Sequence, residues 1–243
     1  MGLFDVFSAE SKLKRLGKRL TEKFGPPENR LKAIEVLAGM GTPEALSTLL
    51  MRFTVTSDSR ITDADEKDRV YHYMVDAGDL AVGPLKDFLR QRDQVAWPLK
   101  ALSELLTPDE VLALVLGELQ RLSGEYTRDP EKRVQLIGWL LEHHPEADPR
   151  VPPALLGFLG DMSDDVKLAA ARGLAQHPTE EAREPLLAAL VAPDQSARVR
   201  QELLATLAQL GFGVQGYREK VEAVAAESGG LYLVDKSGVV KKR

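Results

Sequence analysis

Apolar residues recur at steps of three and four along most of the chain, the spacing that places side chains on one face of an α-helix. The clearest stripes hold a small or β-branched residue, then Leu or Val four positions on, then Leu or Phe after four more. They are Ala45–Leu49–Phe53, Ala81–Leu85–Leu89, Val111–Val115–Leu119, Val151–Leu155–Leu159 and Ala182–Leu186–Leu190. Almost no alternation typical of strands occurs before residue 230, so the pattern predicts an all-α protein.

The predicted helices come in pairs. Another amphipathic segment and a break containing Pro or Gly precede each stripe, and the first helices of the pairs start near Leu31, Val70, Val95, Val134, Val166 and Val199. Thr42-Pro43-Glu44, Thr107-Pro108-Asp109 and Pro178-Thr179-Glu180-Glu181 suit helix starts, because the first N–H groups of a helix have no helical partner and acids are favoured there. A single pair leaves apolar surface uncovered, and stacking the next pair buries it.

One stretch resembles a known repeat family. Residues 165–174 (DVKLAAARGL), followed by residues 185–190 (PLLAAL), are similar to the HEAT-repeat family, in particular the short bacterial HEAT-like or PBS-lyase-type repeats. The resemblance covers roughly residues 28–227. It implies a right-handed α-solenoid of about six HEAT-like helical pairs. The expected organisation is a basic N-terminal helix or cap over residues 1–26, a repeat array over residues 27–228 and a C-terminal hairpin or tail over residues 229–243.

The N-terminal segment is basic and amphipathic. Leu13, Leu16, Leu20 and Phe24 form an apolar stripe, and residues 1–24 hold six Lys or Arg and three Asp or Glu, a net charge of +3. Leu3, Phe4 and Phe7, with Val6, form an apolar tip at its start. We expect this helix to cap the end of the array. Two alternatives stay open: the tip docks into a partner protein, or the segment anchors a membrane-peripheral module. At roughly 1 kcal/mol per basic charge the membrane attraction is weak.

The C-terminal segment has a different pattern. Residues 231–234 and 239–240 are apolar and flank Asp235-Lys236-Ser237-Gly238, which predicts a small β-hairpin packed on the last helices. Residues 229–243 carry a net charge of +3, so the body between the two basic ends carries −11 within a total of −5. An acidic body with basic ends could associate head to tail, although the charge also serves solubility.

Two polar insertions interrupt the pattern, at residues 54–66 and 124–130. The first holds four acids, but it lacks the central Gly and terminal bidentate Glu of an EF-hand loop. We therefore interpret Asp63 as the cap of the next helix and Glu66 as its capping-box partner, three residues later. The second insertion leads into a helix through Asp129-Pro130-Glu131.

The search for catalytic chemistry yields little. Cysteine is absent, the four histidines (His72, His143, His144 and His177) have no metal-ligand spacing, and no phosphate loop or GxSxG elbow occurs. We expect no catalytic residues, no metal and no cofactor, and hence a protein that is not an enzyme. No apolar run is long enough to span a bilayer and no secretory signal is visible, which favours the cytoplasm.

A nucleic-acid enzyme is the less favoured alternative. HEAT-like alkylpurine DNA glycosylases resemble the chain in helical pairing, but they need a basic concave groove with Trp and Asp at the lesion. This chain has an acidic body and only Trp97 and Trp139, so no nucleic-acid partner is expected. Phycobilin lyases share the repeat type only, and no residue here identifies a bilin site.

A binding surface remains as the best functional hypothesis. In HEAT arrays the second helices of successive pairs line the concave side, here called the second-helix face, which can hold a segment of another protein. Positions beside the core stripes are expected to be exposed there and to contact the partner: Thr48, Arg52, Asp87, Ala113, Glu118, Arg183 and Leu187. The sequence thus predicts a non-catalytic protein-binding adaptor or scaffold, and leaves its partner and oligomeric state open.

Overall fold

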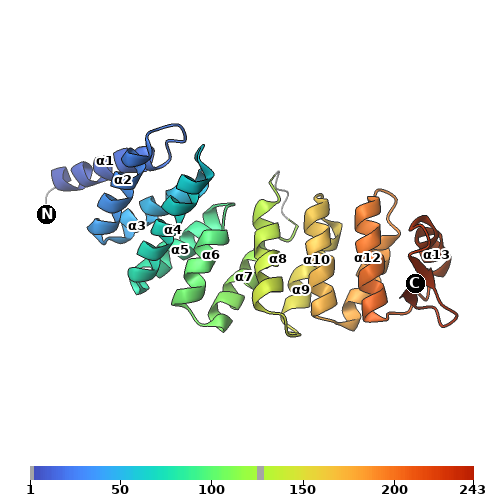
Figure 1. Ribbon diagram of the computed structural model, residues 1–243. Coiled ribbons are helices and arrows are strands. Elements are labelled where there is room, and N and C mark those ends of the chain that lie inside the picture. The colour runs from blue at the N-terminus through green and yellow to red at the C-terminus, as the bar shows by residue number, and fades with distance from the viewer. Residues whose placement is uncertain (1–2, 125–128) are drawn as a thin grey trace. The chain divides into compact units, whose positions relative to one another are not determined.

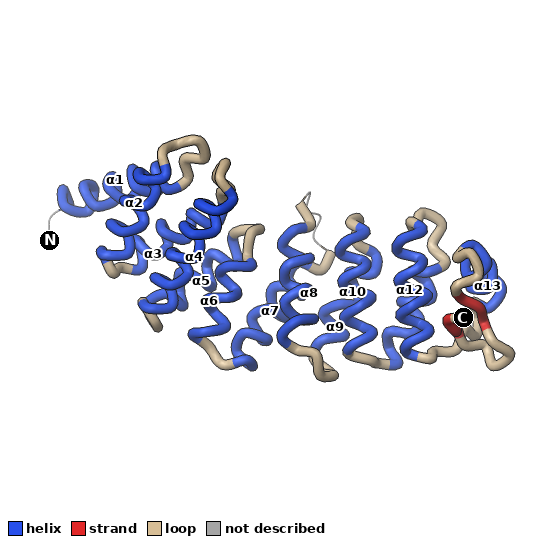
Figure 2. Tube along the Cα trace, in the orientation of Figure 1, coloured by secondary structure: helices blue, strands red, loops and turns tan. Residues whose placement is uncertain are grey.

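The computed structural model describes the backbone of residues 3–124 and 129–243, with the side chains of these residues except 3–8. The described residues are mostly helical and end in one small hairpin, shown in Figure 1 and by element type in Figure 2. The predicted all-α architecture of HEAT-like helical pairs is confirmed. The chain divides into two compact units, residues 1–111 and 112–243, which are described in turn.

Unit 1 contains the first helices of three pairs and the second helices of the first two pairs. Its elements are α1 (Leu3–Leu20), α2 (Pro27–Met40), α3 (Pro43–Leu50), the 3-10 turn η1 (Met51–Thr54), α4 (Arg60–Asp76), α5 (Asp79–Gln91), α6 (Ala96–Leu105) and the first residues of α7 (Pro108–Leu122). Helices α2, α4 and α6 pack side by side as first helices, while α3 packs on α5 as second helices. The predicted stripes Ala45–Leu49–Phe53 and Ala81–Leu85–Leu89 are buried in its core.

The N-terminal helix packs onto this stack. Helix α1 contacts α2 and α3, and its stripe residues Leu16 and Leu20 are 5% and 0% exposed. Gly17 lies so close to α3 that an added Cβ would meet Cγ2 of Thr48 at 3.2 Å. The C-terminal half of α1 therefore covers the apolar end of the first pair.

Helix starts in unit 1 follow the predicted signals in part. Thr42 caps α3 by accepting a hydrogen bond from the Ala45 N–H at 3.3 Å, with Pro43 in the first turn. The interpretation of residues 54–66 as a polar loop is wrong beyond Ser59, because α4 begins at Arg60. Ser59 caps α4 by accepting from the Thr62 N–H, so Asp63 lies in the first turn and is not the cap.

Unit 2 continues with the rest of α7, α8 (Glu131–His143), α9 (Val151–Leu155), the 3-10 turn η2 (Leu156–Gly160), α10 (Asp164–Gln176), the 3-10 turn η3 (Glu180–Ala182), α11 (Arg183–Leu190), α12 (Ala197–Leu210) and α13 (Arg218–Glu227). Helices α8, α10 and α12 stand side by side as first helices (Figure 1). On the other side, η2 contacts α11 and α11 contacts α13.

The C-terminal hairpin is confirmed. Strands β1 (Tyr232–Val234) and β2 (Val240–Lys242) pair antiparallel, with Val234 opposite Val240. Gly238 adopts φ 81° in the turn, a left-handed conformation that favours glycine. Strand β1 packs on α13 and β2 on α12, and Val240 is fully buried. Packing on the last helices supplies the stability that an isolated hairpin lacks.

Candidate binding groove

The structure separates the predicted binding residues by exposure. Asp87 and Ala113 are exposed on α5 and α7, and Thr48 and Arg183 are half-buried. Arg52, Glu118 and Leu187 are buried, so the expectation that these three face solvent is wrong. The physical reason differs between them: Arg52 and Glu118 are enclosed with opposite charges, whereas Leu187 packs in the apolar core of unit 2.

Arg52 belongs to a buried ionic cluster in unit 1, which also contains Arg30, Asp63, Glu66 and Lys67; we call it the Arg52 cluster. The Nε of Arg52 donates to Glu66 at 2.7 Å and its Nη2 donates to Asp63 at 2.6 Å. The Nε of Arg30 donates to the same Glu66 carboxylate at 2.9 Å. Glu66 thus joins α2, η1 and α4, and its predicted capping-box role is wrong.

The Arg52 cluster also determines the charge state of Asp63. Burial on its own would raise the pKa of this carboxyl, but hydrogen bonds from Lys67, the Ser57 N–H and Arg52 outweigh it and lower the pKa from 3.8 to about 2. Asp63 and Glu66 therefore serve as acceptors for arginines inside the fold. Among the described residues, no group of three or more His, Cys, Asp or Glu side chains could hold a metal ion.

Glu118 has a comparable environment in unit 2. Lys132 of α8 lies 3.1 Å from its carboxylate and Arg121 lies 2.9 Å away. Burial raises the pKa of Glu118, and the hydrogen bonds from Arg121 and Lys132 reverse that effect, so the net shift is downward. Glu118 therefore ties α7 to α8 as an ion and offers little surface to a partner.

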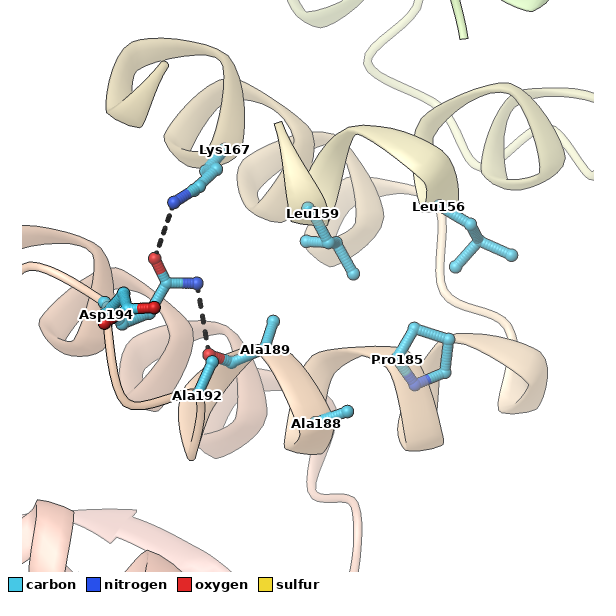
Figure 3. Close-up of a pocket in the computed structure, with 10 residues that line it drawn as sticks. Leu156, Leu159, Lys167, Pro185, Ala188, Ala189, Ala192 and Asp194 are labelled. Atoms are coloured by element: carbon cyan, nitrogen blue, oxygen red, sulfur yellow. Dashed lines mark hydrogen bonds between the residues drawn. The ribbon is translucent and has the colours of Figure 1, made fainter. Parts of the chain in front are cut away.

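An open groove lies on the second-helix face of unit 2, between η2 and α11, with a volume of about 380 Å³ (Figure 3). Leu156 and Leu159 of η2 face Pro185, Ala188 and Ala189 of α11 across it. The remaining lining residues are Gly160, Lys167, Ala192, Asp194 and Gln195. The volume falls at the small end of the range of ligand pockets, and the lining is mostly apolar.

Local sequence explains why this groove stays open. The second helix of this pair is short, because α9 ends at Leu155 and continues as a 3-10 turn only to Gly160. On the opposite wall, Ala188, Ala189 and Ala192 carry only a methyl group each. The short helix on one side and the small side chains on the other leave space that larger residues would have filled, and Ala188 is exposed there.

The polar end of the groove is internally satisfied. The Nζ of Lys167 donates to Oε1 of Gln195 at 2.8 Å, and Nε2 of Gln195 donates to the Ala189 carbonyl at 3.1 Å (Figure 3). Lys167 also lies 3.7 Å from the Asp164 carboxylate. Because these partners come from the chain itself, a ligand would gain mainly by placing apolar groups against the leucines and alanines.

The two tryptophans have packing roles, whereas the apolar tip and part of the second insertion lie outside the described residues. Trp97 stacks on Phe53 at 5.9 Å, and Trp139 is 8% exposed and stacks on His143 at 4.9 Å, so both tryptophans have packing roles. The side chains of Leu3, Phe4 and Phe7 lie outside the described residues, as do residues 125–128 of the second insertion.

Three of the four histidines lie at the ends of helices. His143 ends α8, and His144 and His177 follow the last residues of α8 and α10. The Nδ1 of His177 accepts a hydrogen bond from the Asp148 N–H at 2.9 Å, and burial lowers its pKa. His177 is therefore neutral near pH 7 and holds the loop before α9 in place.

Comparison with known proteins finds HEAT repeats in one part of this chain. A family model described as HEAT repeats matches residues 152–227, which include the groove, so the predicted HEAT-like repeats are confirmed. A solved structure of human deoxyhypusine hydroxylase in complex with glycerol matches with a TM-score of 0.38 and 20% identity, over 93% of this chain and 96% of that one. No curated protein gives a significant match.

The prediction that the chain is not an enzyme is corrected by this comparison. The matching structure is named as a hydroxylase, which is an enzyme. A match at this TM-score carries no activity over to this chain. Within the part of the chain that the structure describes, no helix is long and apolar enough to cross a membrane.

Sequence reasoning reached the second-helix face but missed the groove. Ala188 and Gly160 are exposed although they lie in the second helix of a pair, where polar residues usually face solvent. Small or apolar residues at solvent-facing positions of two successive second helices were the available signal. Met162, two residues after Gly160, is also exposed.

Proposed function

We propose that this HEAT-repeat protein binds an apolar segment of a protein partner on its second-helix face, with the groove between η2 and α11 as the anchoring position. The observation that carries the proposal is the open groove, whose walls are Leu156, Leu159, Pro185, Ala188 and Ala189. Its polar end is already paired within the chain. Such a site favours apolar side chains, which gain free energy by leaving water. Polar groups, which would need new hydrogen bonds, are less favoured.

Two residues that the sequence predicted to contact a partner, Ala113 and Arg183, are at least partly accessible, but the proposal does not depend on them. Ala113 is exposed on α7 and Arg183 is half-buried at the start of α11. Arg183 donates to the Gly213 carbonyl at 2.8 Å and to the Gln215 carbonyl at 2.8 Å. Its guanidinium is thus occupied in holding the segment after α12, and it contributes to a partner contact only through its exposed edge.

A filled groove tests the proposal. Ala188→Trp places an indole where the groove is open, and Ala64→Trp makes the same change at an exposed alanine of α4, a first helix away from the second-helix face. The full-length chain and both variants are used to capture partners from the cells that produce the protein naturally, after unfolding curves confirm that both variants are folded. We expect Ala188→Trp to reduce recovery of specific partners by about ten-fold or more, and Ala64→Trp to leave it unchanged.

The outcomes separate clearly. Equal recovery with Ala188→Trp and the unaltered chain removes the groove from the function. Equal loss with both variants shows that the effect is not specific to the groove and contradicts the proposal. Arg52 is unsuitable for this purpose, because replacing a buried arginine disturbs the fold before it reports on binding.

A further inference from the structure

One side of α1 carries a row of exposed cations, here called the α1 basic face. Its members are Lys12, Lys14, Arg15, Lys18 and Arg19. At 3.6 residues per turn these positions fall within an arc of about 160° around the helix axis and within about 10 Å along it. Leu16 and Leu20 are buried outside this arc, where α1 packs on α2 and α3 (Figure 1). The α1 basic face therefore stays accessible while the opposite side of the helix is packed.

The α1 basic face has no anionic partner within the described part of the chain. None of its side chains forms an ion pair or hydrogen bond with another described residue, whereas each cation of the Arg52 cluster is paired with a carboxylate. Lys14 and Lys18 are four residues apart, as are Arg15 and Arg19, a spacing at which like charges on a helix repel. A row of anions along this face would remove that repulsion.

The α1 basic face holds its ligand by charge and hydrogen bonds. Among residues 9–20, the only other position on the same arc is Ser11, so this part of the face offers no apolar side chain for insertion into a membrane. Arg15 and Arg19 each carry a planar guanidinium, which can donate two parallel hydrogen bonds to one carboxylate. Carboxylates at a matching spacing are thus suitable ligands.

Charge around the α1 basic face limits the size of the partner. Residues 12–23 contain six Lys or Arg and one Glu, a net charge of +5, whereas residues 24–111 contain ten Lys or Arg and fifteen Asp or Glu, a net charge of −5. A long nucleic-acid duplex or a membrane surface would extend past α1 and be repelled by the acidic remainder of unit 1. A short row of carboxylates avoids this repulsion.

We propose that the α1 basic face binds an acidic helix of another protein, one that carries Asp or Glu at steps of three and four. On such a helix successive carboxylates are about 5–6 Å apart, the spacing that also separates Lys14 from Lys18 and Arg15 from Arg19. The two helices lie side by side, with the acidic row of the partner along the α1 basic face. This surface belongs to unit 1 and the groove to unit 2, so the proposal does not depend on the proposed function.

Fluorescence anisotropy with two labelled peptides tests the proposal on the unaltered, full-length chain. Both peptides are alanine- and glutamine-based helices of about 20 residues with the same number of glutamates. In the aligned peptide the glutamates follow steps of three and four and share one face, and in the scattered peptide they are spread around the helix. The chain should bind the aligned peptide about ten-fold more tightly, and the affinity should fall as salt rises from about 0.05 to 0.5 M.

A pair of matched variants locates the binding surface. Arg15→Glu with Arg19→Glu reverses the charge at the centre of the α1 basic face and should weaken binding of the aligned peptide by about ten-fold or more. The control Arg60→Glu with Arg69→Glu makes the same total change at two exposed positions of α4 and should alter the affinity by less than about two-fold. Unfolding curves first confirm that both variants are folded.

Three outcomes would overturn the proposal. Equal affinity of the unaltered chain for the aligned and scattered peptides removes the match in spacing, and this measurement needs no variant. Equal loss in the two double variants shows that total charge, and not the α1 basic face, determines binding. Tighter binding of a DNA duplex of about 20 base pairs, or of phosphatidylserine vesicles, than of the aligned peptide would assign the surface to nucleic acid or membrane.

Discussion

Units 1 and 2 are built from the same kind of helical pair but secure their second helices differently. In unit 1, Arg52 lies in η1, the turn that follows α3, and joins Arg30, Asp63, Glu66 and Lys67 in one buried cluster. In unit 2, Arg133 is buried with Asp161, away from α11. Helix α11 there is anchored by Leu186, Leu187 and Leu190, and the groove lies beside it.

This difference shows how one repeat pattern can serve two purposes. The Arg52 cluster holds irregular segments in unit 1, because Arg30 donates to the Glu22 and Gly25 carbonyls and Arg52 donates to the Val55 carbonyl. Such a cluster needs every member paired, since burying ions costs several kcal/mol each before pairing. Unit 2 also contains buried ion pairs, but α11 packs through leucines, and the small alanines beside them leave the groove open.

The largest expected effect comes from removing the central arginine of unit 1. Arg52→Ala leaves Glu66 and Asp63 buried with fewer cations, and we expect a loss of about 3–5 kcal/mol in the free energy of unfolding of unit 1. The chain has two tryptophans, one in each unit, so urea unfolding followed by fluorescence separates the units. A Trp139→Phe background leaves Trp97, which stacks on Phe53 beside Arg52, as the reporter of unit 1.

A matched control lies on the same helix. Asp65 is exposed on α4, and Asp65→Ala should shift the Trp97 transition by less than about 0.5 kcal/mol. In a Trp97→Phe background, Arg52→Ala should leave the transition reported by Trp139 in place. If Arg52→Ala changes the unfolding transition reported by Trp97 only slightly, the cluster does not stabilise unit 1, and the proposed difference between the two units is wrong.

The sequence predicted the apolar part of this fold well and its ionic part poorly. Stripes such as Ala81–Leu85–Leu89 are buried as expected, because helical periodicity alone decides which side faces the core. Arg52 and Glu118 were expected at the surface, because charged residues are almost never fully buried unless paired. Their partners Glu66 and Lys132 come from the next helical pair, so the pairing depends on how repeats stack.

The groove was equally beyond local prediction. Leu187 and Ala188 are neighbours on α11, yet the first is buried and the second is exposed beside the groove. Helical periodicity separates these two positions. Whether the exposed Ala188 faces open solvent or a groove depends on how far the second helix of the preceding pair extends. That helix, α9, ends in the 3-10 turn η2.

An intermediate effect is expected from His177 in unit 2. Burial lowers the pKa of His177, so protonation is less favourable in the folded chain than in the unfolded chain. The contribution of neutral His177 to the stability of unit 2 should be fully present above about pH 6.5, the ordinary pKa of histidine. It should be lost as the pH falls below that value. Titration of His177 alone can lower the free energy of unfolding by at most about 1.4 kcal/mol per pH unit. Unfolding followed through Trp139 in the Trp97→Phe background measures it.

The local geometry supplies the physical reason. Nδ1 of His177 accepts from the Asp148 N–H at 2.9 Å, and a proton on Nδ1 would face that donor. Hydrogen bonds from Arg150 lower the pKa of Asp148 to about 2, so its carboxylate stays charged and partly opposes the effect, as does the hydrogen bond of His177 with the His144 backbone. His177→Gln, which keeps an acceptor, should flatten the pH dependence, and His72→Gln in unit 1 should not. An unchanged slope in His177→Gln would assign the pH dependence to another group.

The smallest change in unfolding free energy should come from an exposed arginine whose ion pair is nearly as short as those of Arg52. Arg198 of α12 lies 2.8 Å from Asp165 of α10, but the two side chains are 67% and 61% exposed. Water and salt screen such a pair, and ordering two long side chains costs entropy, so Arg198→Ala should change the unfolding free energy of unit 2 by less than about 0.5 kcal/mol. Urea unfolding through Trp139 checks this value. A loss as large as that of Arg52→Ala would show that pairing distance, rather than burial, determines the contribution of arginine in both units.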